Sequence, residues 1–497
     1  MVRKRISLAD YAWLRMDNPN NLMVITGLMT FDAPVDYERF RAVIERSLFR
    51  FKRFRQRLAA PLIPFMWPYW EDDPNFKLES HLIRVQLPAP GDQKDLQDLI
   101  SRLMSTRLDY SRPLWEFYLV ENYGSGGALV SRLHHCLADG IALMQVLLSL
   151  TETEVFPPVS SQARDVAEED KLPPGEPIQT RNANLLNSEN LWSPRKIWEE
   201  GKMMLSDPAH TRHRTRQAID LAATVGKLTL RWPDPPTVFK GPLGMEKRAA
   251  WSEPIALDGV KFIRKAFDCT VNDVLLTAVA GALGRYVDAR GEASKNLKIR
   301  GVIPVNLRPI ELDEELGNKF GLVFLSLPIG IADPIERLHR VKQNMDKLKA
   351  SSEPIATFGI INLLGIVPPR VHKLAVDLFD SKGTAVMTNV PGTQAQLYIA
   401  GAPIKTVMAW VPQTGRIAFG VSIISYNGKV WLGIATDKGL VPDPEAIIDF
   451  FCVEYEEMRA RAQAVQAERP KDLKALLAML DEAIQTLDEL MDLAKKD

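Results

Sequence analysis

Two proline-rich breaks divide this chain into two stretches that each have the pattern of a mixed α/β fold. The first break covers 156–190 and is rich in Pro, Ser, Asp, Glu and Asn, and the second is Trp232-Pro233-Asp234-Pro235-Pro236. Such compositions are typical of exposed linkers. The 497 residues also exceed the length at which one hydrophobic core keeps growing. We therefore expect an N-terminal half at 1–155, a linker and helical crossover at 156–245, a C-terminal half at 246–465 and an amphipathic helix at 466–497.

Apolar periodicity predicts strands and helices in both halves. The N-terminal half combines a strand at 23–31, a helix at 37–54 and a strand at 128–133, after which apolar residues repeat at helical spacing from 141 to 148. A further helical stretch covers 194–230. The C-terminal half has a helical pattern at 271–286 and strand patterns at 298–305, 322–328, 417–425 and 430–436.

Composition excludes several classes of function. Lys and Arg together number 62, as do Asp and Glu, so no net charge favours nucleic acid as a partner. Three cysteines are too few for a disulfide framework, which points to a reducing, cytoplasmic compartment. No apolar run reaches the roughly 18 to 20 residues that cross a bilayer, so we expect any membrane contact to be peripheral. Neither a Walker A loop nor a Gly-x-Gly-x-x-Gly fingerprint is present, and we expect neither a metal nor a bound cofactor.

The segment His134-His135-Cys136-Leu137-Ala138-Asp139-Gly140 lies between the strand at 128–133 and the helix that follows. Successive side chains of a strand point to opposite faces, so one imidazole can face a cavity while the other packs behind it. Asp139 is placed to cap the helix or to form a charged pair, and Gly140 suits a tight turn or a close approach. The alternative is a purely structural histidine pair.

A cavity-facing imidazole has the chemistry of a general base, because its pKa lies near cellular pH. It can take a proton from an alcohol, and acyl transfer from a thioester to that alcohol then needs no covalent enzyme intermediate. Such a transfer needs a dry channel that brings the two substrates together. We set Cys136 aside as a nucleophile, since neighbouring strand residues point apart.

The pattern His-His-x-x-x-Asp-Gly matches the signature of the CoA-dependent acyltransferase superfamily, which includes chloramphenicol acetyltransferase and peptide-synthetase condensation domains. Five further motifs make the chain similar to the bacterial wax ester synthase/diacylglycerol acyltransferase family, in order from about residue 10 to about 458. They are Arg112-Pro113-Leu114-Trp115-Glu116, Val271-Asn272-Asp273-Val274-Leu275, Pro304-Val305-Asn306-Leu307-Arg308-Pro309, Gly317-Asn318-Lys319-Phe320 and Thr388-Asn389-Val390-Pro391-Gly392.

The resemblance implies an α/β fold of two chloramphenicol-acetyltransferase-like domains, each a mixed sheet with flanking helices, and a tunnel between them. It implies acyl-CoA as a co-substrate that donates the acyl chain, and diacylglycerol or a long-chain alcohol as acceptor. His135 would be the base, while His134 and Asp139 would hold the site in shape. The superfamily commonly pairs the aspartate of the motif with an arginine from the other half, which makes Arg308 the expected partner of Asp139. The enzyme would be cytoplasmic, with peripheral contact to a membrane or lipid droplet.

Several supporting residues keep two interpretations. Asn272 and Asp273 begin a helix, where both cap well; the alternative is that they shape the acceptor side or support His135. Residues 113–115 (Pro-Leu-Trp) belong either to the core or to the acyl channel. An apolar stripe in the last 27 residues either packs on the body or binds an interface or a partner helix; it consists of Leu473, Leu476, Leu477, Leu480, Ile484, Leu487 and Met491.

Two other functions stay open. One is a condensation-type acyltransferase that takes its thioester from a carrier protein, and the other is an inert protein that only binds lipid surfaces. His210 and His213 have a spacing that suits metals, but they lie in a basic loop without acidic or thiolate partners. The basic and aromatic run at 49–57 fits an amphipathic helix end or a contact with phosphates.

Overall fold

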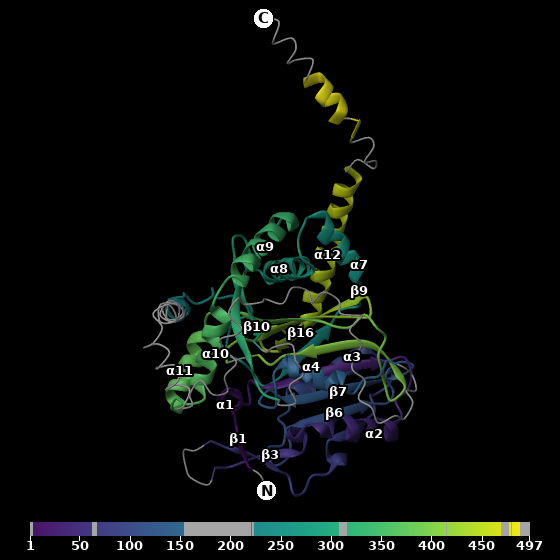
Figure 1. Ribbon diagram of the computed structural model, residues 1–497, viewed down its shortest axis with the longest axis vertical. Coiled ribbons are helices and arrows are strands. Elements are labelled where there is room, and N and C mark those ends of the chain that lie inside the picture. Colours follow the sequence, from purple (N-terminus) through teal and green to yellow (C-terminus); the bar gives the residue numbers. More distant parts are fainter. Residues whose placement is uncertain are drawn as a thin grey trace, which may run out of the picture.

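The computed structural model describes residues 3–61, 67–153, 220, 223–307, 316–413, 415–468, 477–478 and 480–487. Within these ranges two large mixed sheets lie one above the other in Figure 1, and a small sheet lies near the N-terminus. The small sheet has the order β1-β4-β3 and consists of β1 (Lys4–Arg5), β4 (Tyr69–Asp72) and β3 (Gln56–Ala59). The mixed α/β class predicted from the sequence is confirmed.

The first large sheet follows the order β13-β14-β2-β7-β6-β5. Only β5 and β6 run parallel. Its strands are β2 (Val24–Phe31), β5 (Leu82–Val85), β6 (Trp115–Val120), β7 (Gly127–His134), β13 (Tyr398–Ile399) and β14 (Ala402–Trp410). The strands β2 and β7 are buried on both faces, which agrees with their nearly continuous apolar sequences.

The second large sheet has the order β11-β10-β12-β15-β16-β8, and β9 also pairs with β16. The pairs β10–β12 and β12–β15 are parallel, and the rest are antiparallel. Its strands are β8 (Lys247–Trp251), β9 (Ile255–Ala256), β10 (Ile299–Asn306), β11 (Phe320–Leu327), β12 (Ala385–Pro391), β15 (Phe419–Tyr426) and β16 (Lys429–Asp437).

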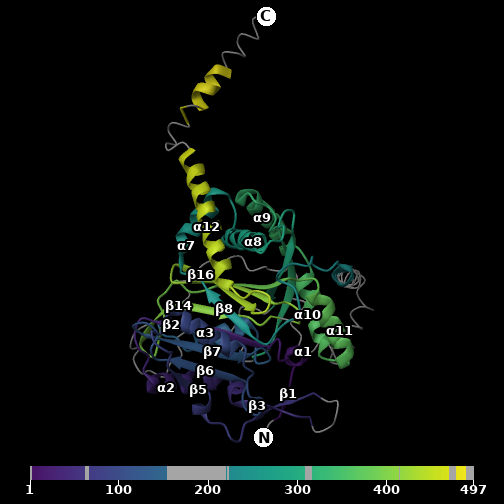
Figure 2. The same ribbon diagram turned by 180° about the vertical axis from the view of Figure 1, so that it is seen from behind.

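Helices cover the sheets. The labelled α-helices are α1 (Leu8–Met16), α2 (Tyr37–Ser47), α3 (Gln93–Met104), α4 (Gly140–Leu148), α7 (Leu257–Ala266), α8 (Val271–Ala289), α9 (Pro334–Lys349), α10 (Glu353–Leu364), α11 (Pro369–Asp380) and α12 (Pro444–Glu468). Described helical residues also occur at 223–230 and, in a C-terminal helix, at 480–487. Figure 2 shows α7, α8, α9 and α12 together on the outer side of the second sheet. Within the described ranges no single helix has the length and apolarity to span a membrane; α7 and α8 pass that test only as a pair bent by 97°.

The two halves are joined by a shared strand and by hydrogen bonds, not only by surface contact. Strand β14 comes from the second half but pairs with β2, so it completes the first sheet. In return, the side chains of Ser101 on α3 and of Ser105 at the C-cap of α3 accept hydrogen bonds from the backbone N–H groups of Ala249 and Lys247 on β8. The junction between the halves is therefore hydrogen-bonded on both sides.

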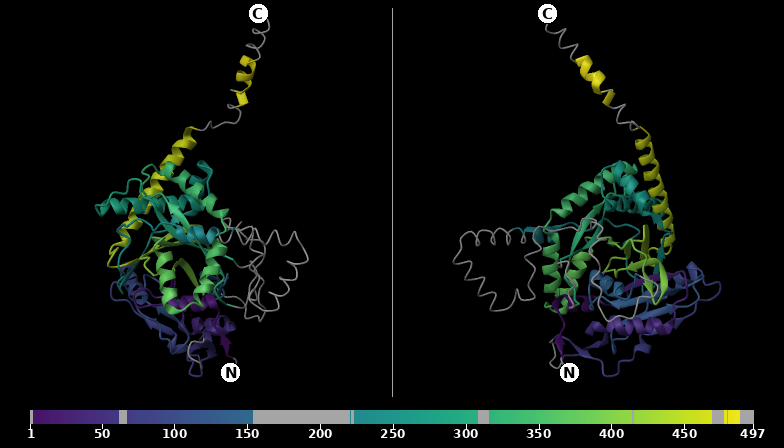
Figure 3. Two further views of the ribbon diagram at one scale, coloured as in Figure 1. Left: turned by 90° about the vertical axis from the view of Figure 1, so that its left-hand side faces the viewer. Right: turned by 45° about the vertical axis from the view of Figure 1, so that its right-hand side comes forward.

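Most predicted elements are confirmed within a few residues, one helix end needs correction, and one of the two interpretations of the C-terminal stripe is not supported. The helix predicted at 37–54 ends at Ser47 and continues as two short 3₁₀ turns, Leu48–Arg50 and Lys52–Arg55. The C-terminal stripe does not pack on the body where the structure describes it, because Leu477, Leu480, Ile484 and Leu487 are 51–60% exposed (Figure 3). Periodicity defines an apolar face but does not say what covers it. The linker at 156–190, His210 and His213 lie outside the described residues, as does most of the helix at 194–230.

Candidate active site

The two predicted histidines follow the inner strand pair of the first sheet. His134 ends β7, and the backbone N–H of His135 donates to the carbonyl of Met23 at 2.7 Å. Asp139 is the N-cap of α4, and its side chain accepts from the N–H of Ala142 at 2.9 Å. A Cβ on Gly140 would meet no atom within 4 Å, so here the glycine is not required by close packing. The strand, loop and helix predicted around the motif are confirmed.

Both ring nitrogens of His134 are engaged. Its Nδ1 accepts the N–H of Cys136 at 3.1 Å, so the ring proton belongs on Nε2. That nitrogen lies 2.9 Å from the hydroxyl of Tyr110, which donates to Asp17 at 2.8 Å. Asp17 in turn accepts the N–H of Met23 at 2.7 Å, and contacts with His134 help to hold its pKa below the usual range against burial. His134 therefore fixes the loop and has no free nitrogen for a substrate.

His135 lies in a different environment. Its ring is buried and stacks on Trp13 with 4.3 Å between ring centroids, and Phe320 of the second half lies 5.6 Å away. Burial lowers the pKa of His135 to about 4, because an apolar surrounding disfavours the imidazolium, although the charge of Asp139 opposes this shift. Its Nδ1 is buried without a hydrogen-bond partner among the described residues. At neutral pH the ring is uncharged and can accept a proton.

The second half closes over the loop through the segment before β11. The side-chain N–H of Asn318 donates to the carbonyl of His135 at 2.8 Å, and the carboxylate of Asp139 accepts the N–H of Lys319 at 3.0 Å. The backbone N–H of Asp139 donates to the carbonyl of Gly317 at 3.4 Å. The predicted Gly-Asn-Lys-Phe motif therefore lies directly against the predicted histidine motif, although 180 residues separate Asp139 from Lys319.

A buried charge network supports this closure from the other side. Asp10 on α1 is fully buried and accepts both the N–H and the side-chain N–H of Asn318, at 3.0 and 2.8 Å. Arg53 pairs with the same carboxylate at 3.0 Å and also donates to the carbonyls of Cys136 and Leu137. Three distant chain segments, around residues 10, 53 and 318, thus support one loop.

Three other predicted site residues, Arg308, Asp273 and Asn272, belong to the second half. Arg308 lies outside the described residues, so its pairing with Asp139 stays a prediction. Asp273 forms a capping box with Thr270 at the start of α8, as the capping interpretation predicts. The amide of Asn272 is hydrogen-bonded to that of Asn389, which joins two of the predicted motifs within the second half.

The Pro-Leu-Trp motif lies in the core behind His134. Leu114 and Trp115 are fully buried, and the carbonyl of Leu114 accepts the N–H of His134 at 3.0 Å. The indole of Trp115 donates to the carbonyl of Phe54 at 2.8 Å and stacks on His81. Neither cavity described next is lined by Pro113, Leu114 or Trp115.

A small, partly open cavity of about 80 Å³ lies between the halves. It is bounded by Met29 on β2, Met144 and Leu148 on α4, and by residues of the second half that include Val390, Ile404 and Ile424. Two of its lining residues, Met144 and Leu148, lie on the helix that follows the histidine motif, but His135 does not line this largely apolar space. No group of three or more His, Cys, Asp or Glu side chains that could hold a metal occurs within the described ranges.

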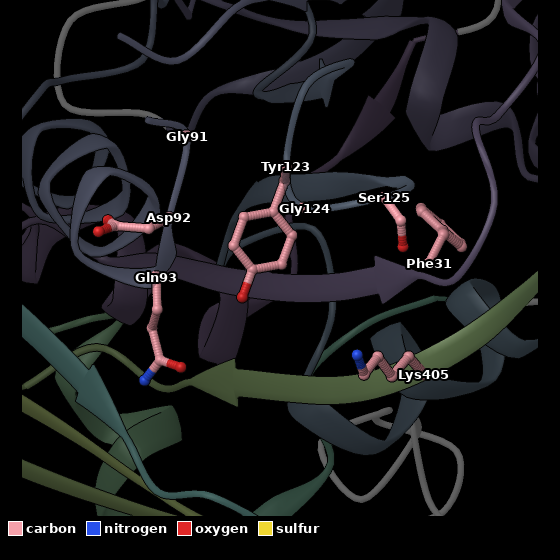
Figure 4. Close-up of a pocket in the computed structure, with 8 residues that line it drawn as sticks. All are labelled: Phe31, Gly91, Asp92, Gln93, Tyr123, Gly124, Ser125 and Lys405. Carbon is pink, nitrogen blue, oxygen red and sulfur yellow. The ribbon is translucent and has the colours of Figure 1, made fainter. Parts of the chain in front are cut away.

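A second cavity, of about 250 Å³, lies elsewhere. Figure 4 shows Gln93, Tyr123, Ser125 and Lys405 around it. It reaches Phe31, which pairs with Gly127, whereas His134 pairs with Val24 at the other end of the same strands. This polar cavity is therefore separated from the histidine motif by the length of β2.

Sequence reasoning missed the residues that lie near His135 in the structure but far from it along the chain. Asp10, Trp13, Asp17 and Arg53 carry no local signal, since their partners lie far away in the chain. Asn318 was quoted only as part of the Gly-Asn-Lys-Phe motif, and the sequence assigned it no role in the site. On the sequence alone, Cys136 was rejected as a nucleophile. The structure supports this, because burial raises the pKa of its thiol well above the usual value.

The fold is shared with solved two-domain proteins. The wax ester synthase/diacylglycerol acyltransferase from Marinobacter aquaeolei superposes with a TM-score of 0.63 at 21% identity, covering 93% of this chain and 100% of that one. The first condensation domain of the calcium-dependent antibiotic synthetase gives a TM-score of 0.57 at 15% identity, covering 92% and 97%. The chain therefore shares the fold of these two proteins.

Sequence comparison narrows this class. Residues 6–275 match the wax ester synthase/diacylglycerol acyltransferase catalytic domain, and residues 316–459 match the C-terminal domain of the same family. The chain belongs to this family and is an acyltransferase, as its motifs predicted. A putative diacylglycerol O-acyltransferase of Mycobacterium tuberculosis is 26% identical over 469 residues, covering 90% of this chain and 88% of the relative. A probable diacylglycerol O-acyltransferase of the same organism is 26% identical over 427 residues, covering 85% and 88%.

Proposed function

We propose that this enzyme moves a long-chain acyl group from acyl-CoA to the hydroxyl of diacylglycerol or of a long-chain alcohol, with His135 as the general base. The observation that carries the proposal is the contrast between adjacent imidazoles. His134 has both nitrogens engaged, whereas His135 is buried and neutral and its Nδ1 has no hydrogen-bond partner among the described residues. The names of the relatives, which are diacylglycerol O-acyltransferases, support diacylglycerol as the acceptor. Diacylglycerol and a long-chain alcohol both react through a hydroxyl group.

In the proposed reaction Nε2 of His135 accepts the proton of the acceptor hydroxyl. The hydroxyl oxygen then attacks the thioester carbonyl, an ester C–O bond forms and the C–S bond breaks. The proton passes from His135 to the departing sulfur, so CoA leaves as its thiol and the ring returns to its neutral state. No covalent bond to the enzyme is needed.

This assignment places the ring proton of His135 on Nδ1. The amide oxygen of Asn318 is also buried without a partner among the described residues, while its amide nitrogen already donates to the carbonyl of His135. We therefore propose Asn318 as the residue that orients the base. His134 and Asp139 hold the loop, and the cavity beside α4 is the proposed seat for acyl carbons, at one end of the predicted tunnel.

The test is CoA release by the purified protein given palmitoyl-CoA and either hexadecanol or a diacylglycerol, with the lipid product identified. We expect the His135→Ala variant to lose ester formation by a factor on the order of 100 to 10,000. The matched control is Cys136→Ala, which should keep most of the activity because a buried thiol of raised pKa takes no part.

Each outcome separates the possible functions. Ester formation that survives His135→Ala contradicts the assignment of the base. A protein that reacts only with an acyl group on a carrier protein is of the condensation type. Lipid binding with no transfer to any acceptor supports the inert binder. We expect the active enzyme to be cytoplasmic and to contact lipid peripherally.

A further inference from the structure

An exposed apolar face lies on the hairpin of α10 and α11. Large apolar side chains here point into solvent, with Leu374 the most open at 70% exposure; they are Leu363, Ile366, Val371, Leu374 and Leu378. Figure 3 shows the hairpin at the edge of the body, away from the outer helices of the second sheet. We call these five side chains the hairpin face. A soluble surface rarely leaves such a cluster uncovered without a use.

Two further apolar side chains lie at the base of the hairpin. Trp232 is 84% exposed and Leu230 is 83% exposed. Their segment is fixed to the end of α11, because the ammonium group of Lys382 donates to the carbonyls of Thr229 and Arg231 at 2.9 and 2.6 Å. An exposed tryptophan beside an apolar helix face is typical of groups that sit at a lipid interface.

The charges beside the face have an excess of one sign. Lys373 and Arg416 both lie near Asp377, at 2.9 and 3.8 Å, and Arg370 is exposed beside them. Among the described residues beside the face, three cations therefore accompany one partly exposed carboxylate. The whole chain has a formal net charge of zero, so this excess is local. It complements an anionic headgroup layer.

The hairpin also packs on the helix that carries the ring stacked on His135. Arg15 of α1 donates to the carbonyls of Leu364 and Val367 at 2.9 and 2.8 Å and so holds the turn between α10 and α11. A Cβ on Gly365 would lie 2.3 Å from the carbonyl oxygen of Leu8, so this contact has no room for a side chain. The same helix presents Trp13 to His135.

We propose that the hairpin face, with Leu230 and Trp232, docks the enzyme on an anionic bilayer surface next to the site where the acceptor reacts. The proposal rests on the proposed function only in that the acceptor dissolves in lipid. A bilayer fits better than a protein partner, because the face combines spread apolar side chains, an exposed tryptophan and excess positive charge. The hairpin contacts α1, and Trp13 of α1 stacks on His135. Docking through the hairpin therefore brings the lipid to the same side of the protein as α1.

The test is sedimentation of the full-length protein with vesicles of phosphatidylcholine alone or mixed with phosphatidylglycerol, in the absence of substrate. We expect binding to the mixed vesicles that falls by about tenfold or more in the double variant Ile366→Ser/Leu374→Ser, because both side chains would leave the bilayer. Arg370→Gln/Lys373→Gln should weaken binding to the mixed vesicles by up to about tenfold and should change binding to neutral vesicles little.

The matched control is Leu480→Ser/Ile484→Ser, which makes the same chemical change on the exposed C-terminal helix. Unchanged binding in this control supports the hairpin, whereas loss here with none in Ile366→Ser/Leu374→Ser overturns the proposal. A dimer in solution that dissociates in the hairpin variant also overturns it, since a second copy would then cover the face.

Transfer to a short, water-soluble alcohol separates this proposal from the proposed function. The hairpin variants should keep that activity and lose transfer to vesicle-embedded diacylglycerol. Vesicle binding through the hairpin with no transfer to any alcohol leaves the docking surface standing and refutes the proposed function. Full transfer from vesicles by the hairpin variants refutes the docking surface alone.

Discussion

Two buried histidines of the first half, His81 and His135, have nearly the same immediate packing. His81 stacks on Trp115 with centroids 4.5 Å apart and planes at 18°, and His135 stacks on Trp13 at 4.3 Å and 20°. Burial lowers the pKa of both rings. Stacking and burial therefore do not by themselves define a base.

The difference lies in what else reaches each ring. His81 hydrogen-bonds through Nδ1 to the carbonyl of Trp115 at 2.7 Å, within its own half. His135 has no such bond at Nδ1, and its loop is closed by Asn318 from the other half. In the proposed mechanism the Nδ1 of His135 holds the ring proton toward Asn318, so that Nε2 takes the proton of the substrate where the two halves meet.

The largest expected effect comes from making one substitution at both positions. His135→Gln should lower kcat/KM by a factor on the order of 100 to 10,000, because glutamine keeps a polar side chain but cannot take up the proton. His81→Gln should change kcat/KM by less than about threefold, since its role is structural. Steady-state CoA release measures both. Equal losses in the two variants would refute the contrast.

The next effect tests the orientation of the base from the second half. Asn318→Ala should lower kcat on the order of 10- to 100-fold and leave KM for acyl-CoA nearly unchanged, because the hydrogen bonds to His135 and Asp10 are lost. Asn122 is a matched control, since its side chain also bonds a distant segment, at both backbone groups of Leu87.

Asn122→Ala should lower stability without lowering kcat. Thermal unfolding and steady-state kinetics on both variants decide the matter. If Asn318→Ala reduces activity only in proportion to the folded fraction, its role is structural.

A smaller effect should appear in the pH profile. With the pKa of His135 near 4, kcat/KM should stay flat from pH 8 to about 5 and fall only below that, as the imidazolium forms. Trp13→Ala opens the imidazole ring of His135 to water and should raise the pKa of His135 toward 6.5. If this pKa rises to about 5.5, the rate at pH 5 falls about fourfold. Trp13→Phe keeps a stacked ring and should leave the acid limb in place. An unchanged profile in Trp13→Ala would show that the limb belongs to another group.

The sequence was sufficient for the local parts of this structure. The alternation along 128–133 and the spacing from 141 onward define β7 and α4, and Asp139 was placed at a helix start by its residue type. The motif pattern also gave the family. These features depend on neighbours within a few residues, which is what periodicity and capping report.

The long-range contacts were beyond such reasoning. Nothing in the sequence around Asp10 or Arg53 indicates that they meet Asn318 and the carbonyls after His135. The pairing of β14 with β2 was missed for the same reason, since any apolar strand satisfies the pattern. The amphipathic C-terminal stripe kept two interpretations, because a face can be read from one sequence but its partner cannot; its described side chains are exposed and do not pack on the body.

The smallest expected effect is on stability, and its sign follows from the direction of the shift. The folded state holds His135 at a pKa near 4, below the 6.5 of an unfolded chain, so the unfolded state binds more protons between these values. Stability should therefore fall as pH drops below about 6.5. Between pH 7 and 5.5 the contribution of His135 is about 1 kcal/mol. Denaturant unfolding of His135→Gln should show a pH slope flatter by that amount, and His81→Gln a change of the same sign. A slope unchanged in His135→Gln would mean that its ring is not buried as a neutral base.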